Sequence, residues 1–182
     1  MADSLRPILI GVSGGIAAFK TASLVSRLVQ SGRRVRVILT PDAQRFIGPA
    51  TFAALCGEPP VTEIWDSRFP LGAHIELAAE CGQFVIAPAT ARVLASLAVG
   101  DSRDLLATTY LCFPPTSVLL APAMSDVMWR HPAVQRNLQQ LHADGIRTVG
   151  PEEGWLSCRR QGAGRMAEPD QILSAIASHP DA

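Results

Sequence analysis

Two residue types are scarce in this sequence, and neither sign of charge is in excess. Among the 182 residues, Lys20 is the only lysine and Asn137 the only asparagine, whereas arginine is frequent. The 16 basic residues balance the 16 acidic ones. This balance argues against the basic surface of a protein that binds nucleic acid or an anionic membrane. We therefore expect neither nucleic acid nor a membrane as a partner.

The sequence also lacks the signals of secretion, membrane insertion and metal binding. Its start, MADSLRPILIGVSGG, carries an early Asp3 and an apolar stretch that breaks at Ser13, so it resembles neither a signal peptide nor a membrane span. The cysteines form no CxxC pair, and no histidine stands at metal-ligand spacing, so we predict no metal site. We expect reduced thiols and a cytoplasmic protein. The four cysteines are Cys56, Cys81, Cys112 and Cys158.

Apolar segments alternate with helical patterns along the chain. Continuous apolar runs between helices are typical of a parallel sheet covered on both faces. We predict a single-domain α/β fold over residues 1–182, an open parallel sheet with helices on both faces, of the Rossmann or flavodoxin-like kind. Residues from about 150 to 166 are rich in glycine and arginine and show no period, so we predict a functional loop there. The expected strands are residues 7–12, 34–40, 83–89, 117–123 and 146–150, and the expected helices include residues 16–29, a helix broken or kinked at Gly48–Pro49, and residues from about 169 to 178.

Unusual short motifs follow three of the predicted strands. SGGIA follows the first strand, PATAR the third and PAMSDVMW the fourth. Parallel sheets bind ligands outside the carboxyl ends of their strands, so these motifs lie where a ligand site is expected. The turn with Gly14 and Gly15 fits neither the GxGxxG fingerprint nor the P-loop. Its N–H groups at a helix start could bind a phosphate, or the glycines could simply allow a tight turn, and both interpretations stay open.

The last of these motifs has the composition of a binding lip. In APAMSDVMW, two of the four methionines, Met124 and Met128, stand with Trp129 around Ser125 and Asp126. A buried strand end needs no Ser–Asp pair, and a plain surface loop would not carry so much apolar surface. We interpret the segment as a wall of a ligand site.

Two reactive side chains stand apart from these motifs. His74 lies at the start of a possible short helix, where a lone histidine is more often a structural hydrogen-bonding residue than a catalytic base. Cys158 lies among Arg159, Arg160 and Arg165, in a stretch whose glycines would let a lid open and close. The alternative for that stretch is an exposed basic loop with an incidental cysteine.

Taken together, these stretches resemble the homo-oligomeric flavin-containing cysteine decarboxylases, and most closely the phosphopantothenoylcysteine decarboxylases of coenzyme A synthesis. The resemblance runs from about Ile8 to Ala167. It rests on five motifs in the same order, GGIAAFK, HIELA, APATARVLASLAVG, PAMSDVMW and LSCRRQGAGRM. The resemblance implies FMN as the cofactor, bound by Gly14, Gly15, Ile16, Thr40, Thr90, Ala91, Arg92 and Val93.

The same resemblance implies the catalytic roles. His74 corresponds to the family's acid–base residue, and Cys158 corresponds to the proton donor that acts when an enethiol is reduced to a saturated aminothiol. Relatives that modify peptides and stop at the enethiol lack this cysteine, so its presence favours the coenzyme A branch. The residues implied to bind the substrate are Met124, Ser125, Met128 and Arg165.

The implied enzyme is a carboxy-lyase with a small-molecule substrate. It would convert 4'-phosphopantothenoylcysteine to 4'-phosphopantetheine, as a homotrimer or homododecamer whose active sites lie between protomers. Because no second domain follows residue 182 in this sequence, we expect the ligase that often accompanies this enzyme to be a separate chain.

The departures from the family pattern all concern asparagine. Arg92, Asp104 and Ser125 stand where the family has asparagine, and the asparagine replaced by Ser125 is implied to hold the substrate carboxylate. Serine offers one shorter donor where asparagine offers a donor and an acceptor. Arg92 could compensate, and so could an arginine of the predicted loop over residues from about 150 to 166, which corresponds to the family's clamp loop. Because asparagine is scarce in the whole chain, its absence from a motif carries less weight here.

Two other functions remain open at this point. One is a flavoprotein decarboxylase of another substrate, such as a peptide C-terminal cysteine. The other is a non-catalytic FMN-binding regulatory subunit, which Ser125 favours and which the presence of His74 and Cys158 disfavours.

Overall fold

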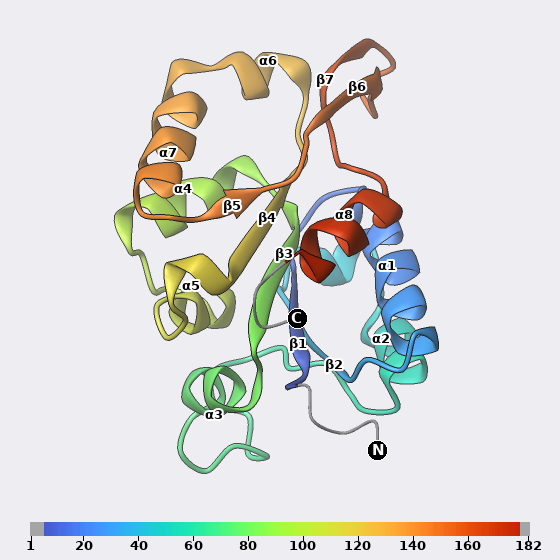
Figure 1. Ribbon diagram of the computed structural model, residues 1–182, viewed down its shortest axis with the longest axis vertical. Helices are drawn as coiled ribbons and strands as arrows, with labels where there is room; N and C mark the ends of the chain where they lie inside the picture. Colours follow the sequence, from blue (N-terminus) through green and yellow to red (C-terminus); the bar gives the residue numbers. More distant parts are fainter. Residues whose placement is uncertain (1–5, 179–182) are drawn as a thin grey trace.

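Five parallel strands form the centre of the molecule in the computed structural model, which describes residues 6–178 (Figure 1). Residues 1–5 and 179–182 of the predicted domain lie outside the described part. The strand order is β2-β1-β3-β4-β5, and every neighbouring pair is parallel. This is the predicted open parallel sheet. The strands are β1 (Ile8–Val12), β2 (Val35–Leu39), β3 (Gln83–Ala89), β4 (Val118–Pro122) and β5 (Arg147–Thr148).

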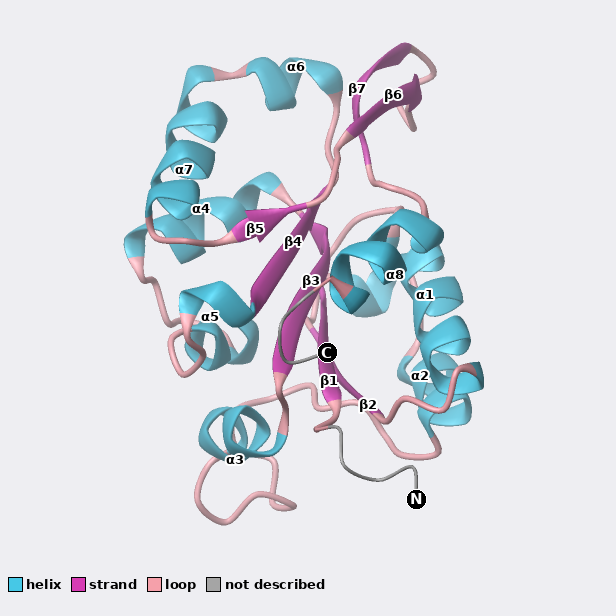
Figure 2. Ribbon diagram, in the orientation of Figure 1, coloured by secondary structure: helices cyan, strands magenta, loops and turns pink. Residues whose placement is uncertain are grey.

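Helices cover both faces of the sheet, as predicted (Figure 2). Alternate strand residues point to opposite faces, so Ile8 and Ile10 pack in one core cluster and Leu9 in the other. The first cluster joins the sheet to α1 (Ala18–Gln30), α2 (Pro49–Cys56) and α8 (Pro169–Ala177). The second joins it to α3 (Ala73–Glu80), α4 (Ala91–Val99), α5 (Leu105–Tyr110) and α7 (Pro132–Ala143). No helix within residues 6–178 is both long enough and apolar enough to span a bilayer.

Short elements complete the chain and confirm the predicted break in the second helical segment. A 3-10 turn, η1 (Ala43–Arg45), ends before Gly48, and α2 begins at Pro49. Proline is favourable at this first helical position because the N–H that it lacks would have no partner within the helix. The remaining short elements are η2 (Pro115–Ser117) and α6 (Asp126–Arg130).

Residues 150–166, predicted to be a functional loop, contain regular structure that the sequence pattern did not indicate. Most of this stretch is an antiparallel hairpin of β6 (Glu152–Trp155) and β7 (Gln161–Arg165). Backbone hydrogen bonds hold it, including one from Met124 N to Gly164 O at 2.9 Å. A Cβ at Gly164 would lie 2.3 Å from the Met124 carbonyl oxygen, so only glycine permits this approach. A strand made largely of glycine and polar residues carries no alternating apolar pattern, which is why the sequence did not reveal it.

Candidate active site

A cavity of about 710 Å³ lies at the carboxyl ends of β1, β3 and β4, with one side formed by the β6–β7 hairpin. In the order β2-β1-β3-β4-β5, the chain goes from β1 to β2 on one side of β1, whereas the later strands β3, β4 and β5 follow on its other side. Such a reversal opens a crevice between the ends of β1 and β3, where folds of this kind bind ligands. The predicted residues that line the cavity are Gly14, Gly15, Ile16, Thr90, Ala91, Arg92, Met124, Ser125, Met128 and Arg165.

The turn after β1 offers backbone donors to this cavity. Within residues 6–178, no residue accepts a hydrogen bond from the N–H groups of Gly15, Ile16 or Ala17, which precede the 13-residue helix α1. Unpaired N–H groups at the start of a helix attract anions, above all phosphate. Of the two interpretations of this turn, the geometry therefore favours phosphate binding over a plain tight turn.

A second helix begins at the same cavity. Thr90 precedes α4, and its backbone N–H donates to Ser13 Oγ at 3.4 Å. The Ser13 hydroxyl in turn donates to the Pro88 carbonyl at 2.6 Å, which joins the turn after β1 to the end of β3. Two helix N-termini thus meet at one wall of the cavity, and their dipoles both favour a negative ligand.

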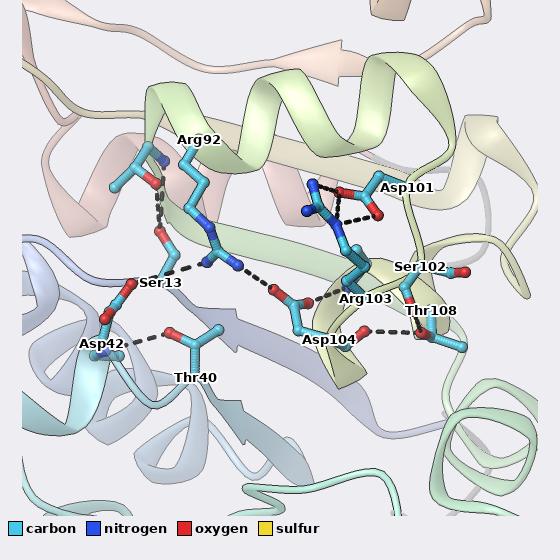
Figure 3. Close-up of polar contacts among 12 residues, drawn as sticks. Ser13, Thr40, Asp42, Arg92, Asp101, Ser102, Arg103, Asp104 and Thr108 are labelled. Atoms are coloured by element: carbon cyan, nitrogen blue, oxygen red, sulfur yellow. Dashed lines mark hydrogen bonds and ion pairs between the residues drawn. The ribbon is translucent and has the colours of Figure 1, made fainter.

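Arg92 extends from the start of α4 between two aspartates (Figure 3). Its Nη2 lies 3.1 Å from Asp104 Oδ2, and its Nη1 lies 3.9 Å from Asp42 Oδ2. The other oxygen of Asp104 accepts a hydrogen bond of 2.9 Å from Ala107 N and so caps α5. Two of the three residues that stand where the family has asparagine, Arg92 and Asp104, therefore form an ion pair with each other.

The lip after β4 lies against the hairpin, as the Met124–Gly164 hydrogen bond shows. Ser125 caps α6, and its Oγ accepts a hydrogen bond of 3.4 Å from Met128 N. Met124, Ser125 and Met128 line the cavity, whereas Trp129 packs against the core of its own chain. The interpretation of this segment as a wall of the site agrees with the geometry for all of these residues except Trp129.

A cluster of charges ties the hairpin to α1. Lys20 Nζ lies 2.9 Å from Glu168 Oε1 and donates a hydrogen bond of 2.9 Å to the Met166 carbonyl. Arg165 also pairs with Glu168. The hydrogen bond from Lys20, helped by the charges of Lys20 and Arg165, lowers the pKa of the Glu168 carboxyl. Glu168 therefore stays ionised at neutral pH and holds both cations at the cavity wall.

Two predicted cofactor residues do not line this cavity. Val93 is buried in the core beneath α4, because the residue after Arg92 on a helix faces a different direction. Thr40 lines a second cavity of about 220 Å³ beyond β2, and its hydroxyl accepts a hydrogen bond of 3.2 Å from Ala43 N.

The two predicted catalytic residues are not brought to the cavity, nor to each other. His74 lies in the first turn of α3. Helix α3 lies at the opposite end of the sheet from the hairpin (Figure 1). The Nδ1 of His74 is buried and has no hydrogen-bond partner among the described residues. Cys158 is exposed in the turn between β6 and β7. Of the other thiols, burial raises the pKa of Cys81 to about 12 and that of Cys56 to about 11, so neither can supply a thiolate at neutral pH.

Several lining residues escaped the sequence analysis. Lys20 lines the cavity, although the motif GGIAAFK predicted no role for it. Its being the only lysine of the chain is the sequence feature that could have indicated one. Trp155 also lines the cavity, and its position in an otherwise polar stretch was a weaker indication of a binding role. Asp42 follows β2 without any motif of its own. The lining residues without a predicted role include Ser13, Ala17, Phe19, Lys20, Asp42, Trp155, Leu156 and Ser157.

Comparison with known proteins identifies the family. A family model described as flavoprotein matches residues 1–179, so the chain belongs to the flavoprotein family. The coenzyme A biosynthesis bifunctional protein CoaBC of Bacillus subtilis (strain 168) is 42% identical over 175 residues, which cover 96% of this chain and 43% of that protein. CoaBC of Haemophilus influenzae is 39% identical over 173 residues, which cover 94% of this chain and 43% of that protein. The chain thus spans about two fifths of the length of the curated relatives that it matches.

Solved structures of similar fold cover nearly the whole chain. The FMN-dependent cysteine decarboxylase SpaF matches with a TM-score of 0.81 and 32% identity, over 97% of both chains. A cysteine-to-serine mutant of PPC decarboxylase, complexed with pantothenoylaminoethenethiol, matches with a TM-score of 0.84 and 28% identity, over 95% of this chain and 97% of that one. The predicted family, flavin-containing cysteine decarboxylases close to phosphopantothenoylcysteine decarboxylase, is confirmed, and so is the predicted fold class.

Proposed function

We propose that this protein is an FMN-dependent carboxy-lyase that converts 4'-phosphopantothenoylcysteine to 4'-phosphopantetheine in coenzyme A biosynthesis. The observation that carries the proposal is the meeting of the GGIAAFK, PATAR, PAMSDVMW and GAGRM motifs around one cavity of about 710 Å³. The relatives described above include a PPC decarboxylase and proteins of coenzyme A biosynthesis. Four cysteines that stay free fit a reducing compartment, the cytoplasm.

The cavity suits FMN in volume and in chemistry. Cofactor sites have volumes of about 300–1,000 Å³ and mostly apolar walls. The unpaired N–H groups of Gly15, Ile16 and Ala17 offer a place for the phosphate. The side chains of Ile16, Phe19 and Trp155, together with Met124 and Met128, offer apolar surface for the ring system.

The proposed reaction needs an electron acceptor. Loss of CO₂ from an ordinary cysteine carbon leaves a carbanion with no electron sink, whereas oxidation of the thiol-bearing carbon to a thioaldehyde provides one. Bound FMN would supply this reversible two-electron oxidation and return the electrons afterwards. The protein's own part is to hold the substrate. Ser125 would donate a hydrogen bond to its carboxylate, and Arg165, at the foot of the hairpin, would add positive charge.

A complete site requires a second copy of the chain. Because His74 lies at the far end of the sheet from the cavity, it can act only on a substrate held by a neighbouring protomer. The segment that precedes α3 suits a contact, since Trp65 is 87% exposed and Leu71 is 73% exposed. Aromatic side chains are enriched at interfaces. We therefore propose a homotrimer, or a homododecamer built from trimers, with each active site between two protomers. Light scattering of the purified protein would give the assembly size.

The decisive experiment measures CO₂ release by the purified protein with FMN, on 4'-phosphopantothenoylcysteine and on a peptide that ends in cysteine. Turnover of the first substrate alone is expected. Turnover of the peptide alone would assign the protein to the peptide-modifying branch. FMN binding with turnover of neither substrate would indicate a non-catalytic, regulatory subunit.

Ser125→Ala is expected to slow CO₂ release, because it removes one hydrogen bond to a charged group. The loss is about 1–3 kcal/mol of transition-state stabilisation, measured from kcat/KM. Alanine also removes the cap of α6, so Ser125→Asn is the informative partner, since asparagine is an equally good cap. Ser125→Asn should keep the wild-type rate or raise it. An active wild type whose rate is unchanged in Ser125→Ala would remove Ser125 from the site.

A further inference from the structure

The cations that line the cavity belong to two ion-paired clusters. Lys20 and Arg165 share Glu168, at the base of the hairpin. Arg92 belongs to the other cluster and lies between Asp42 and Asp104 (Figure 3). Three cations thus face three carboxylates. A ligand that carries a dianionic phosphate therefore meets cations that already have carboxylate partners, and it competes with those partners for them.

The contact between Arg92 and Asp42 is the one most easily displaced. Its atoms are 3.9 Å apart, and the side chains are 58% and 62% exposed. Exposed pairs of this kind contribute little to stability. Lys20, by contrast, is only 11% exposed and is held at 2.9 Å by both Glu168 and the Met166 carbonyl. Arg92 is therefore the cation that can exchange partners at the smallest cost.

Asp42 places a negative charge beside the proposed phosphate site. A Cβ at Gly14 would lie 2.4 Å from Asp42 Cβ, so the aspartate packs directly against the glycine turn. A carboxylate at this position repels a phosphate bound by the N–H groups of the same turn. The guanidinium of Arg92 is the cation within reach of Asp42, and it offsets this repulsion.

Asp104 fixes the position from which Arg92 acts. The cap hydrogen bond from Ala107 N holds one carboxylate oxygen, and the other lies 3.1 Å from Arg92 Nη2. A guanidinium has five N–H donors. Arg92 can therefore keep Asp104 on one edge while its remaining donors serve another acceptor.

We propose that Asp42, Arg92 and Asp104 form an exchange triad for the phosphate of the flavin, an inference that rests on the proposed FMN function. Arg92 leaves Asp42 for the phosphate, and Asp104 keeps the guanidinium at the cavity wall throughout. Phosphate carries more charge than a carboxylate and accepts more hydrogen bonds, so the exchange favours the bound state. The triad thereby makes the site select FMN over riboflavin, which has the same ring system without the phosphate.

The test compares the affinities of the flavin-free full chain for FMN and for riboflavin, by quenching of flavin fluorescence. Arg92→Gln should raise the Kd for FMN about ten- to a hundredfold and leave the Kd for riboflavin within about twofold. Asp42→Asn should act in the opposite direction and lower the Kd for FMN by about two- to tenfold. Asp104→Asn keeps a capping acceptor for α5 and should raise the Kd for FMN less than Arg92→Gln does.

Arg103→Gln is the matched control, because Arg103 is a neighbouring, 87% exposed arginine that pairs with Asp101 and does not line the main cavity. It should leave both affinities unchanged. Equal weakening of both ligands by Arg92→Gln would overturn the triad and place Arg92 at the ring system or in the fold. An unchanged Kd for FMN would overturn it as well. If the wild type bound neither flavin, the proposed function itself would fail.

Discussion

His74→Asn is expected to abolish measurable CO₂ release while the purified protein keeps its flavin. Asparagine retains a polar side chain of similar size, but it cannot take up or release a proton near neutral pH. Removal of a general acid–base residue typically costs about 10²–10⁴ in rate. Flavin content should not change, because His74 is remote from the cavity of its own chain. Initial rates of CO₂ release and the flavin absorbance of the same samples are the two measurements.

His142→Asn is the control for this substitution. His142 is a surface histidine of α7 that contacts Thr148 and lies outside the cavity, so its replacement should leave the rate unchanged. Normal turnover by His74→Asn would contradict the assigned role. Loss of flavin together with activity would instead point to a structural role for the buried imidazole.

A mixture of two inactive or impaired variants tests the shared site directly. If each site combines His74 of one protomer with the hairpin of another, subunits of His74→Asn and Cys158→Ser should form some native sites when they are exchanged. Complete turnover to the aminothiol should then partly recover. If the subunits exchange but turnover to the aminothiol does not recover, the proposal of a shared site is contradicted.

Cys158→Ser is expected to separate decarboxylation from the reduction that follows it. A serine hydroxyl is a far weaker acid than a thiol, so it should not deliver the proton that saturates the enethiol. CO₂ should still be released, but the product should keep its double bond and lack two hydrogens, which mass spectrometry detects, and the two electrons should remain on the flavin, which absorbance reports as reduced. Cys112→Ser replaces another exposed thiol and should yield the normal aminothiol. Formation of the saturated product at the wild-type rate by Cys158→Ser would assign the proton to another donor.

The sequence by itself determined the α/β fold and ten of the 21 residues that line the cavity. Strands such as residues 83–89 are continuous apolar runs, and the helices beside them repeat apolar residues at helical spacing, so both are encoded locally. The glycine turn, Thr90 and Ser125 follow strands directly. Since parallel strands end at one edge of the sheet, their position in the chain was enough to place them near a ligand.

Other features depend on residues far apart in the chain, and only the tertiary structure decided them. A backbone hydrogen bond joins the hairpin of residues 152–165 to the lip, and Lys20, which lies more than a hundred residues earlier, binds the carbonyl of Met166 directly after it. The ion pair of Arg92 with Asp104 joins two helices, and no periodicity relates these residues. His74 could be recognised by its motif, but its distance from the cavity follows only from the tertiary structure. His74 precedes β3, whereas the cavity lies at the carboxyl end of that strand. Sequence patterns report which face of an element is buried, whereas charge pairs and distances between sites arise only when the elements pack together.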